Sequence, residues 1–245
     1  MIIGKNFSND PFTILVFELP SGYNLKSMNI ILILTFLFSL PGLKTDLREL
    51  KDPELAKRVI LTGSIPFITA FALDKPVQTF IQDNLRYESY LNLTNELGGK
   101  MALAGLGLLF LATRSIGDQK FKDFSYTAFE SAVLAGFTSV LFKITIGRAR
   151  PSKSSSPYKF NPPGFDDEYQ ALPSGHTTIA FAWLTVLANY YGENKIIKYG
   201  SYALASSTAI ARVYKNRHWL SDCVLGAMIG YYFGKRLSQL HLKGG

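Results

Sequence analysis

"ALPSGHTTIAFAW", residues 171–183, is the stretch of sequence that predicts how this chain folds. A polar loop ends at Ser174, and an apolar block, residues 178–191, follows almost at once. Serine is a favoured N-cap residue, so the stretch predicts that a helix begins at Gly175. The apolar block lacks the alternation of polar and apolar residues that marks a half-exposed strand. The sequence therefore favours a fold built from apolar helices.

Apolar blocks of this kind recur along the chain. There are six of them, at residues 59–73, 101–113, 126–142, 178–191, 196–211 and 223–233. Each predicts a helix that is buried on most sides, so we expect an all-α fold, a six-helix bundle embedded in a membrane. All six are shorter than the about 20 apolar residues of a full membrane span. A soluble, secreted helical protein therefore stays open as the alternative.

The composition limits the kinds of partner. The chain has 245 residues, with 26 Lys and Arg against 18 Asp and Glu, and a formal net charge of +8. Such a surplus suits an acidic partner, whether phosphate, anionic lipid or nucleic acid, and charge alone does not choose among them. The single cysteine, Cys223, excludes an intrachain disulfide and a cysteine-cluster metal site.

The basic segments predict a membrane orientation. If all six blocks cross the membrane, the segments rich in Lys and Arg lie on the same side of it. These segments are residues 44–58, 114–123, 193–198 and 235–243. The positive-inside rule makes that side cytoplasmic. The loops on the other side, residues 74–100, 149–174 and 212–222, would then face the periplasm or the exterior.

The N-terminal segment, residues 1–42, is predicted to be a leader. Its apolar run, residues 30–38, follows Lys26 and is short, which is typical of a signal peptide or an anchor. A buried amphipathic segment is the alternative, and Met28 is an alternative start of translation. Residues 43–245 are expected to form one helical domain.

A first basic motif is "KITIGRARP", residues 143–151. Lys143 and Arg150 are seven residues apart, so on a helix they would share a face and could clamp a phosphate, with Arg as the bidentate partner. Arg148 would lie off that face, toward solvent or lipid headgroups. A basic cluster at a helix end is also commonly an interfacial anchor.

The second motif is the Ser-Gly-His of the opening stretch. The N–H groups of a helix that starts here would bind an anion, and Gly175 would allow a phosphate to approach the backbone. His176 can donate a proton at physiological pH, although a purely structural histidine is an equal alternative.

A third motif lies in "ARVYKNRHWLSD", residues 211–222. His218 and Asp222 are four residues apart, so on a helix the carboxylate could accept the Nδ1–H of the imidazole. Arg212 adds another cation. Two apolar blocks separate His176 from Arg212, so the chain leaves one end of the bundle and returns to it. All three motifs are therefore predicted to meet at one end.

Together, "K-x6-RP" at residues 143–151, "PSGH" at 173–176 and "R-x5-H-x3-D" at 212–222 resemble the signature of the type 2 phosphatidic acid phosphatase family. This family includes bacterial acid phosphatases, lipid phosphatases and vanadium haloperoxidases. The resemblance extends over about residues 55–235. One departure is Ala211, where the family often has serine before the arginine.

The resemblance implies a role for each motif residue. His218 would be the nucleophile that becomes a phosphohistidine, Asp222 would orient it, and His176 would be the general acid and then the base. The phosphate oxygens would be bound by Lys143, Arg150, Ser174, Gly175 and Arg212. No metal and no cofactor is implied. The adjacent acids Asp166, Asp167 and Glu168 are expected to be solvated, and His241 to lie at the surface.

The sequence therefore predicts a metal-independent phosphatase of phosphate monoesters or pyrophosphates, with a lipid-linked substrate, a membrane as its surroundings and no nucleic-acid partner. A soluble periplasmic acid phosphatase, a vanadate-dependent haloperoxidase and a non-catalytic lipid-phosphate binding or transport protein remain as alternatives.

Overall fold

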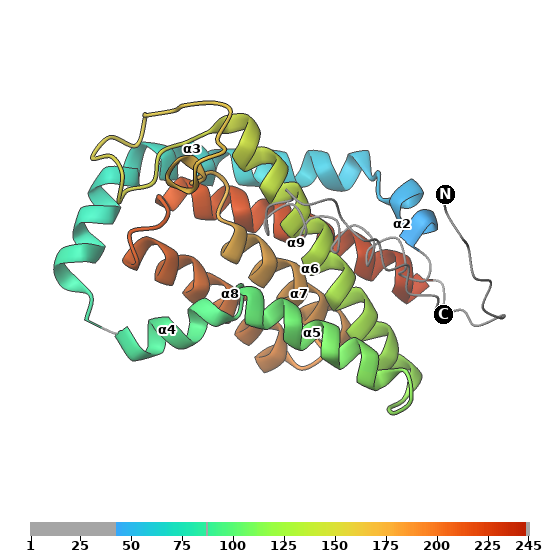
Figure 1. Cartoon of the computed structure of the whole chain (residues 1–245). Helices are drawn as coiled ribbons and strands as arrows, with labels where there is room; N and C mark the ends of the chain where they lie inside the picture. The colour runs from blue at the N-terminus through green and yellow to red at the C-terminus, as the bar shows by residue number, and fades with distance from the viewer. Residues whose placement is uncertain (1–42, 87, 244–245) are drawn as a thin grey trace, which may run out of the picture. The chain divides into compact units, whose positions relative to one another are not determined.

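The computed structural model describes residues 43–86 and 88–243, and this part of the chain is helical (Figure 1). Its helices are α2 (Leu43–Glu49), α3 (Pro53–Asn84), α4 (Glu88–Glu96), α5 (Lys100–Thr113), α6 (Gln119–Ile146), α7 (Gly175–Tyr190), α8 (Lys195–Tyr214) and α9 (Leu220–Lys243), with a short 3-10 turn, η1 (Asp167–Tyr169). No strand occurs among these residues. The chain divides into two compact units, Met1–Thr45 and Asp46–Gly245, and the second is described here.

The predicted all-α fold is confirmed, and each of the six apolar blocks lies on one helix, namely α3, α5, α6, α7, α8 or α9. Two short helices, α2 and α4, were not marked by an apolar block, because their sequences are largely polar. The predicted leader, residues 1–42, lies outside the described residues.

Helix α7 lies at the centre of the second unit, where it packs against α6, α8 and α9 (Figure 1). Around this centre α3 packs on α9, α5 on α6 and α4 on α8. The side chains of Ala180, Ala182 and Leu184 on α7 are completely buried. The helix that follows the Ser-Gly-His motif is therefore held on three sides, which fixes the position of its first turn.

Three glycines on α9, spaced four residues apart, leave no room for a side chain against α7. A Cβ on Gly230 would lie 2.3 Å from the carbonyl oxygen of Thr178. A Cβ on Gly226 would lie 2.7 Å from the carbonyl oxygen of Ser174, and one on Gly234 would lie 2.3 Å from that of Ala182, one turn to either side along α7. Small residues at this spacing let two helix backbones approach closely. The contact sets the first turn of α9 beside the first turn of α7.

The helix ends follow from local sequence. Asp52, Asp118 and Asn194 cap α3, α6 and α8 through their side-chain oxygens. Ser174 caps α7 by accepting from the N–H of Thr177, so the predicted helix start at Gly175 is confirmed. These caps satisfy backbone N–H groups that a helix leaves unpaired at its start.

Two of the described helices, α3 and α6, are long and apolar enough to cross a membrane, and the α4–α5 pair, bent by 47°, could form a third span. Only 17% of the apolar window of α3 is buried, and Ile65 and Ile68 are 72% and 67% exposed. Long helices that turn apolar side chains outward are the architecture of a membrane protein. That the blocks on α7, α8 and α9 also cross stays a prediction.

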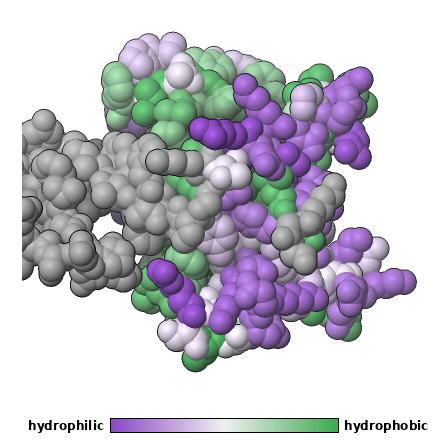
Figure 2. Space-filling view, turned by 90° about the vertical axis from the view of Figure 1, so that its right-hand side faces the viewer, coloured by the Kyte–Doolittle hydropathy of each residue, from purple (hydrophilic) through white to green (hydrophobic). Residues whose placement is uncertain are grey.

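Figure 2 shows the surface from the end where the turn between α5 and α6 projects and α9 finishes. Hydrophilic side chains cover much of this end, and hydrophobic ones gather toward its upper part. A largely hydrophilic end is what is expected where a helical bundle leaves a membrane.

Candidate active site

The predicted site residues meet at one end of the bundle, at the left of Figure 1. Lys143 lies in the last turn of α6, and Gly175 and His176 open α7 after the Ser174 cap. Arg212 lies near the end of α8, and Asp222 lies in the first turn of α9. Arg150 lies in the loop before α7, and His218 lies in the loop before α9. The N–H of Ser174 donates to the carbonyl oxygen of Asp222 at 2.9 Å. A Cβ on Gly175 would lie 3.6 Å from Cε of Lys143. The predicted convergence is therefore confirmed.

The route by which Arg150 reaches the site differs from the prediction. We expected Lys143 and Arg150 to share one helix face, but α6 ends at Ile146 and Gly147 takes a left-handed conformation with φ 62°. A left-handed glycine is a common helix terminator, and it redirects the chain before the arginine. Arg150 then approaches through the loop, where its Nη1 donates to the carbonyl oxygen of Arg217, the residue before His218, at 3.1 Å.

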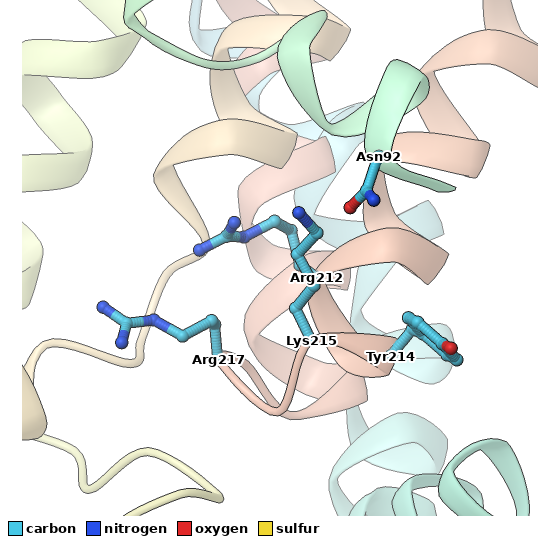
Figure 3. A pocket seen from close by; sticks show the side chains of 5 residues that line it. All are labelled: Asn92, Arg212, Tyr214, Lys215 and Arg217. Carbon is cyan, nitrogen blue, oxygen red and sulfur yellow. The ribbon is translucent and has the colours of Figure 1, made fainter. Parts of the chain in front are cut away.

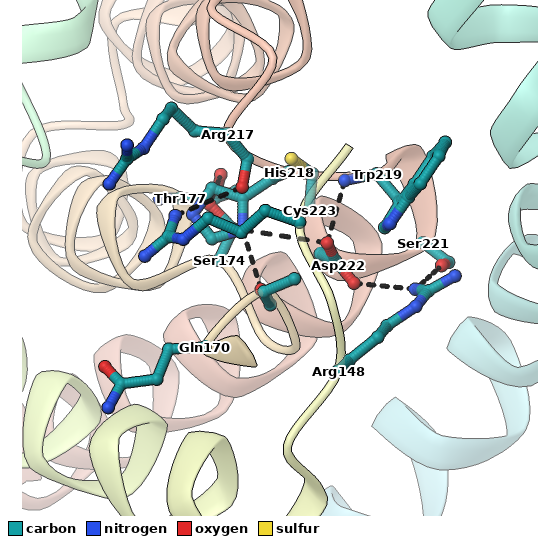
Figure 4. Close-up of polar contacts among 12 residues, drawn as sticks. Arg148, Gln170, Ser174, Thr177, Arg217, His218, Trp219, Ser221, Asp222 and Cys223 are labelled. Carbon is teal, nitrogen blue, oxygen red and sulfur yellow. Dashed lines mark hydrogen bonds and ion pairs between the residues drawn. The ribbon is translucent and has the colours of Figure 1, made fainter. Parts of the chain in front are cut away.

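The imidazole of His218 is buried, and its Nδ1 lies 2.6 Å from the carbonyl oxygen of Ala171 (Figure 4). A carbonyl oxygen only accepts, so Nδ1 carries the proton and Nε2 keeps a free lone pair. We expected the Asp222 carboxylate to accept this proton, but its Oδ2 is 3.6 Å from Nδ1. Burial, reinforced by the charges of Lys143, Arg212 and Arg150, holds the pKa of His218 well below its usual value.

The carboxylate of Asp222 is bound by other groups. Its Oδ2 accepts from the N–H of Trp219 at 2.7 Å, and its Oδ1 lies 2.6 Å from Nη1 of Arg148 (Figure 4). Asp222 therefore acts on His218 mainly by fixing the backbone of the next residue and by placing negative charge 3.6 Å from the ring. A nearby carboxylate stabilises an imidazolium even without a direct hydrogen bond.

The prediction for Arg148 was wrong, because this side chain is completely buried. Its guanidinium joins Asp222 to Asp74 of α3, with Nη2 at 2.6 Å from Oδ2 of Asp74. It also donates to Ser221 Oγ at 2.7 Å and to the carbonyl oxygen of Pro157. Arg148 thus ties three parts of the chain together behind the histidine. Sequence reasoning missed Asp74, since nothing local marks one acid on α3 as its partner.

Arg212 has an unused donor. Its Nη1 donates to Oδ1 of Asn95 on α4 at 2.7 Å, whereas its Nε is buried and has no hydrogen-bond partner among the described residues. Ser139 Oγ, one turn before Lys143, is likewise buried without a described partner. Buried donors without partners are rare, and an incoming anion would satisfy them. Asn95 carries no motif by which the sequence could have revealed it.

Asp167 occupies the Arg150 side of the site. Its Oδ1 is 2.8 Å from Nη2 of Arg150, and its Oδ2 is 2.7 Å from Nη2 of Arg217. We expected this acid to be simply solvated; its side chain is 60% exposed, yet it bridges two arginines. A carboxylate on a guanidinium fork takes the position that a phosphate would use.

His176 is backed by the break between α4 and α5. A Cβ on Gly98 would lie 1.9 Å from the carbonyl oxygen of His176, so only glycine fits there. Trp183, two turns further along α7, donates to the carbonyl oxygen of Leu97 at 2.8 Å. Burial and then the charge of Arg212 lower the pKa of His176 to about 3. A bound phosphate would oppose this shift, because its negative charge favours the protonated imidazole.

A pocket of about 540 Å³ opens beside the site (Figure 3). It is lined by Asn92, Arg212, Tyr214, Lys215 and Arg217. Sequence reasoning missed Lys215 and Arg217, although both lie in the five-residue spacer of the third motif and could have been noticed there. Their charges extend the cationic surface outward from Arg212.

Comparison with known proteins finds a family model that matches the C-terminal part of the chain. Residues 126–244 match the PAP2 superfamily, and all three motifs lie in this stretch. This match supports the predicted resemblance of the chain to the type 2 phosphatidic acid phosphatases.

The chain is also similar to particular members. Over 94 residues it is 34% identical to the lipid A 1-phosphatase of Porphyromonas gingivalis. These residues make up 38% of this chain but only 18% of that protein. The structure of Aquifex aeolicus LpxE, 24% identical, matches 70% of this chain and 95% of its own length with a TM-score of 0.48. A transmembrane PAP2 type phosphatidylglycerolphosphate phosphatase from Bacillus subtilis, 13% identical, matches 75% and 96% with a TM-score of 0.51, which is a likeness of fold.

Proposed function

We propose that this protein is a metal-independent membrane phosphatase that hydrolyses the phosphate monoester or pyrophosphate of a lipid-linked substrate through a phosphohistidine on His218. The observation that carries the proposal is the hydrogen bond between Nδ1 of His218 and the carbonyl oxygen of Ala171. It leaves the lone pair of Nε2 free in a site surrounded by cations, which is what a nucleophile toward a phosphate anion requires.

The reaction would take two steps. Nε2 of His218 attacks phosphorus in line, the bond to the leaving oxygen breaks, and His176 protonates that oxygen. His176 then takes a proton from water, the water oxygen attacks the phosphohistidine, and the P–N bond breaks to release phosphate. The equatorial oxygens would be held by Lys143, Arg150, Arg212 and the start of α7, where negative charge must be stabilised during transfer.

A lipid-linked substrate is supported by three observations. The outward side chains of α3 are apolar, so the chain meets lipid acyl chains. The pocket beside Arg212 carries Lys215 and Arg217, which suit an anionic headgroup. The relatives named above are a lipid A 1-phosphatase and a phosphatidylglycerolphosphate phosphatase. Which phosphorylated lipid is used would be decided by phosphate release from a panel of them.

The site is proposed to face the periplasm or exterior, with the basic segments at the other end in the cytoplasm. Single cysteines test this orientation, because the native Cys223 is buried. A cysteine at Ser155, in the loop before α7, should react in intact cells with an impermeant thiol reagent, and one at Asp118, before α6, should not. The reverse pattern would invert the orientation, and loss from the membrane fraction would favour the secreted alternative.

The mechanism is tested by separating the two histidines with para-nitrophenyl phosphate, whose leaving group needs no acid. His176→Ala should still form a phosphoenzyme, and the adduct should accumulate because water activation is impaired. His218→Ala should form none. The adduct should be acid-labile and base-stable, as a phosphoramidate is. A phosphoenzyme trapped in His218→Ala and absent in His176→Ala would reverse the two roles.

A further inference from the structure

A second cluster of titratable side chains lies far from the phosphate site. Asp46 of α2, Glu130 of α6 and His241 of α9 bring one ligating atom each within 4.8 Å of one another. Nε2 of His241 is 3.3 Å from Oδ1 of Asp46 and 3.8 Å from Oε2 of Glu130. Glu130 precedes Lys143 by 13 residues, which is about 20 Å along the helix. The cluster is therefore separate from the catalytic machinery.

His241 was expected at the surface, but its side chain is only 16% exposed and its ring stacks on Tyr126 at 5.3 Å. Its tautomer follows from Thr127. The hydroxyl of Thr127 donates to the carbonyl oxygen of Asp123 at 2.6 Å, so its oxygen accepts from Nδ1–H of His241 at 2.7 Å. Nε2 therefore directs its lone pair toward the two carboxylates. Three electron-rich atoms face one another, and a cation among them would remove the repulsion.

Glu130 gives the second, independent sign of a ligand. Its side chain is completely buried, and no hydrogen bond of ordinary geometry reaches either carboxylate oxygen from the described residues, although Tyr126 and Asp46 lie close to it. His241 is the one described cationic group whose nitrogen lies within 4.0 Å of it. A buried carboxylate inside a membrane protein without such partners is costly and generally functional. A divalent cation would balance the charges of the two carboxylates.

We propose that Asp46, Glu130 and His241 bind one divalent transition-metal ion, Zn²⁺ or Mn²⁺. One imidazole and two carboxylates are ligands that these ions accept, and metal–ligand bonds of about 2.0 Å give ligand-to-ligand distances of about 3.3 Å in a tetrahedral site. The outer contacts have the usual form: Thr127 fixes the imidazole, and the Tyr126 hydroxyl donates to Oδ2 of Asp46 at 3.4 Å, which leaves Oδ1 for the metal. The ion links α2, α6 and α9 at the end of the bundle opposite the phosphate site.

The test uses the full chain, free of any affinity tag, in detergent micelles after dialysis against a chelator. Zn²⁺ is added to one sample and Mn²⁺ to a second, unbound metal is removed, and metal per chain and the thermal midpoint are measured. Wild type should retain one Zn²⁺ per chain and melt at a higher temperature than the metal-free protein. Glu130→Gln and Asp46→Asn should bind Zn²⁺ at least about tenfold more weakly, and Thr127→Val about tenfold to a hundredfold more weakly. Asp123→Asn, a change of the same kind on α6 outside the cluster, should bind like wild type.

The proposal is overturned if wild type retains neither Zn²⁺ nor Mn²⁺ in a stoichiometric amount, which would make the cluster a protonated ion-pair network. Equal Zn²⁺ affinity in wild type and in Asp46→Asn would also overturn it. Because Asp46 lies on a short helix, this variant can still be measured if the change at the buried Glu130 prevents folding. Metal content and melting do not depend on phosphatase activity, so failure of the proposed function would leave this result unaffected.

Discussion

Arg148→Met tests whether the buried guanidinium holds the back of the site together. Methionine replaces the aliphatic stem of the arginine and has no charge, so it fills part of the space but leaves Asp74 and Asp222 without their shared cation. Both carboxylates and the guanidinium are completely buried, and both charge contacts are 2.6 Å long. The change therefore removes two close ion pairs at once without exposing either acid to water.

Removing one partner of a buried ion pair costs about 3–5 kcal/mol, because the remaining charge is left unpaired in a medium of low polarity. For a domain of this size each kcal/mol lowers the thermal midpoint by about 2–4 °C, so the expected fall is roughly 6–20 °C. Adding Asp74→Asn to Arg148→Met should recover part of this loss, since it removes one of the unpaired charges.

The assay is thermal unfolding in detergent followed by tryptophan fluorescence, because the Trp219 ring lies 5.9 Å from the guanidinium carbon of Arg148. Arg114→Met, at the exposed end of α5, is the matched control and should change stability by less than about 0.5 kcal/mol. Equal midpoints for Arg148→Met and Arg114→Met would refute the reasoning and mean that water or another cation compensates the two acids.

The other predictions concern packing, the phosphate site and pH. Gly230→Ala should destabilise the protein by about 1–3 kcal/mol, since its Cβ would meet the Thr178 carbonyl oxygen, whereas Gly200→Ala, with open space, should not; equal midpoints would contradict this. Asp167→Asn should tighten vanadate inhibition roughly twofold to fivefold by freeing Arg150, and weaker inhibition would mean that Asp167 positions it. Arg150→Lys should lower turnover about tenfold or more, because the fork is lost; unaltered turnover would mean that Arg150 only holds the loop in place through Arg217 and Asp167. With para-nitrophenyl phosphate, the midpoint of the acid limb of the kcat/KM profile should lie below pH 6.5, because the lowered pKa keeps His218 neutral. A midpoint at or above pH 6.5 would contradict that assignment.

The sequence by itself determined the helices and the meeting of the motifs. Apolar blocks and capping residues act within a few positions of themselves, so the start of α7 at Gly175 and the approach of Lys143, Arg212 and His218 could be predicted. Each depends on local backbone chemistry or on counting how often the chain crosses the bundle. The glycine spacing on α9 was equally local, although its meaning needs the opposing helix.

Only the tertiary structure decided which group each polar atom contacts. The Nδ1–H of His218 donates to the Ala171 carbonyl oxygen and not to Asp222. Arg148 turns inward and contacts Asp74, which lies 74 positions earlier in the sequence. Asp46, Glu130 and His241 are likewise far apart in sequence and meet only because α2, α6 and α9 pack together. A hydrogen bond or ion pair depends on differences of about 1 Å in the placement of two side chains. Those differences are set by how the helices pack, and local sequence does not encode them.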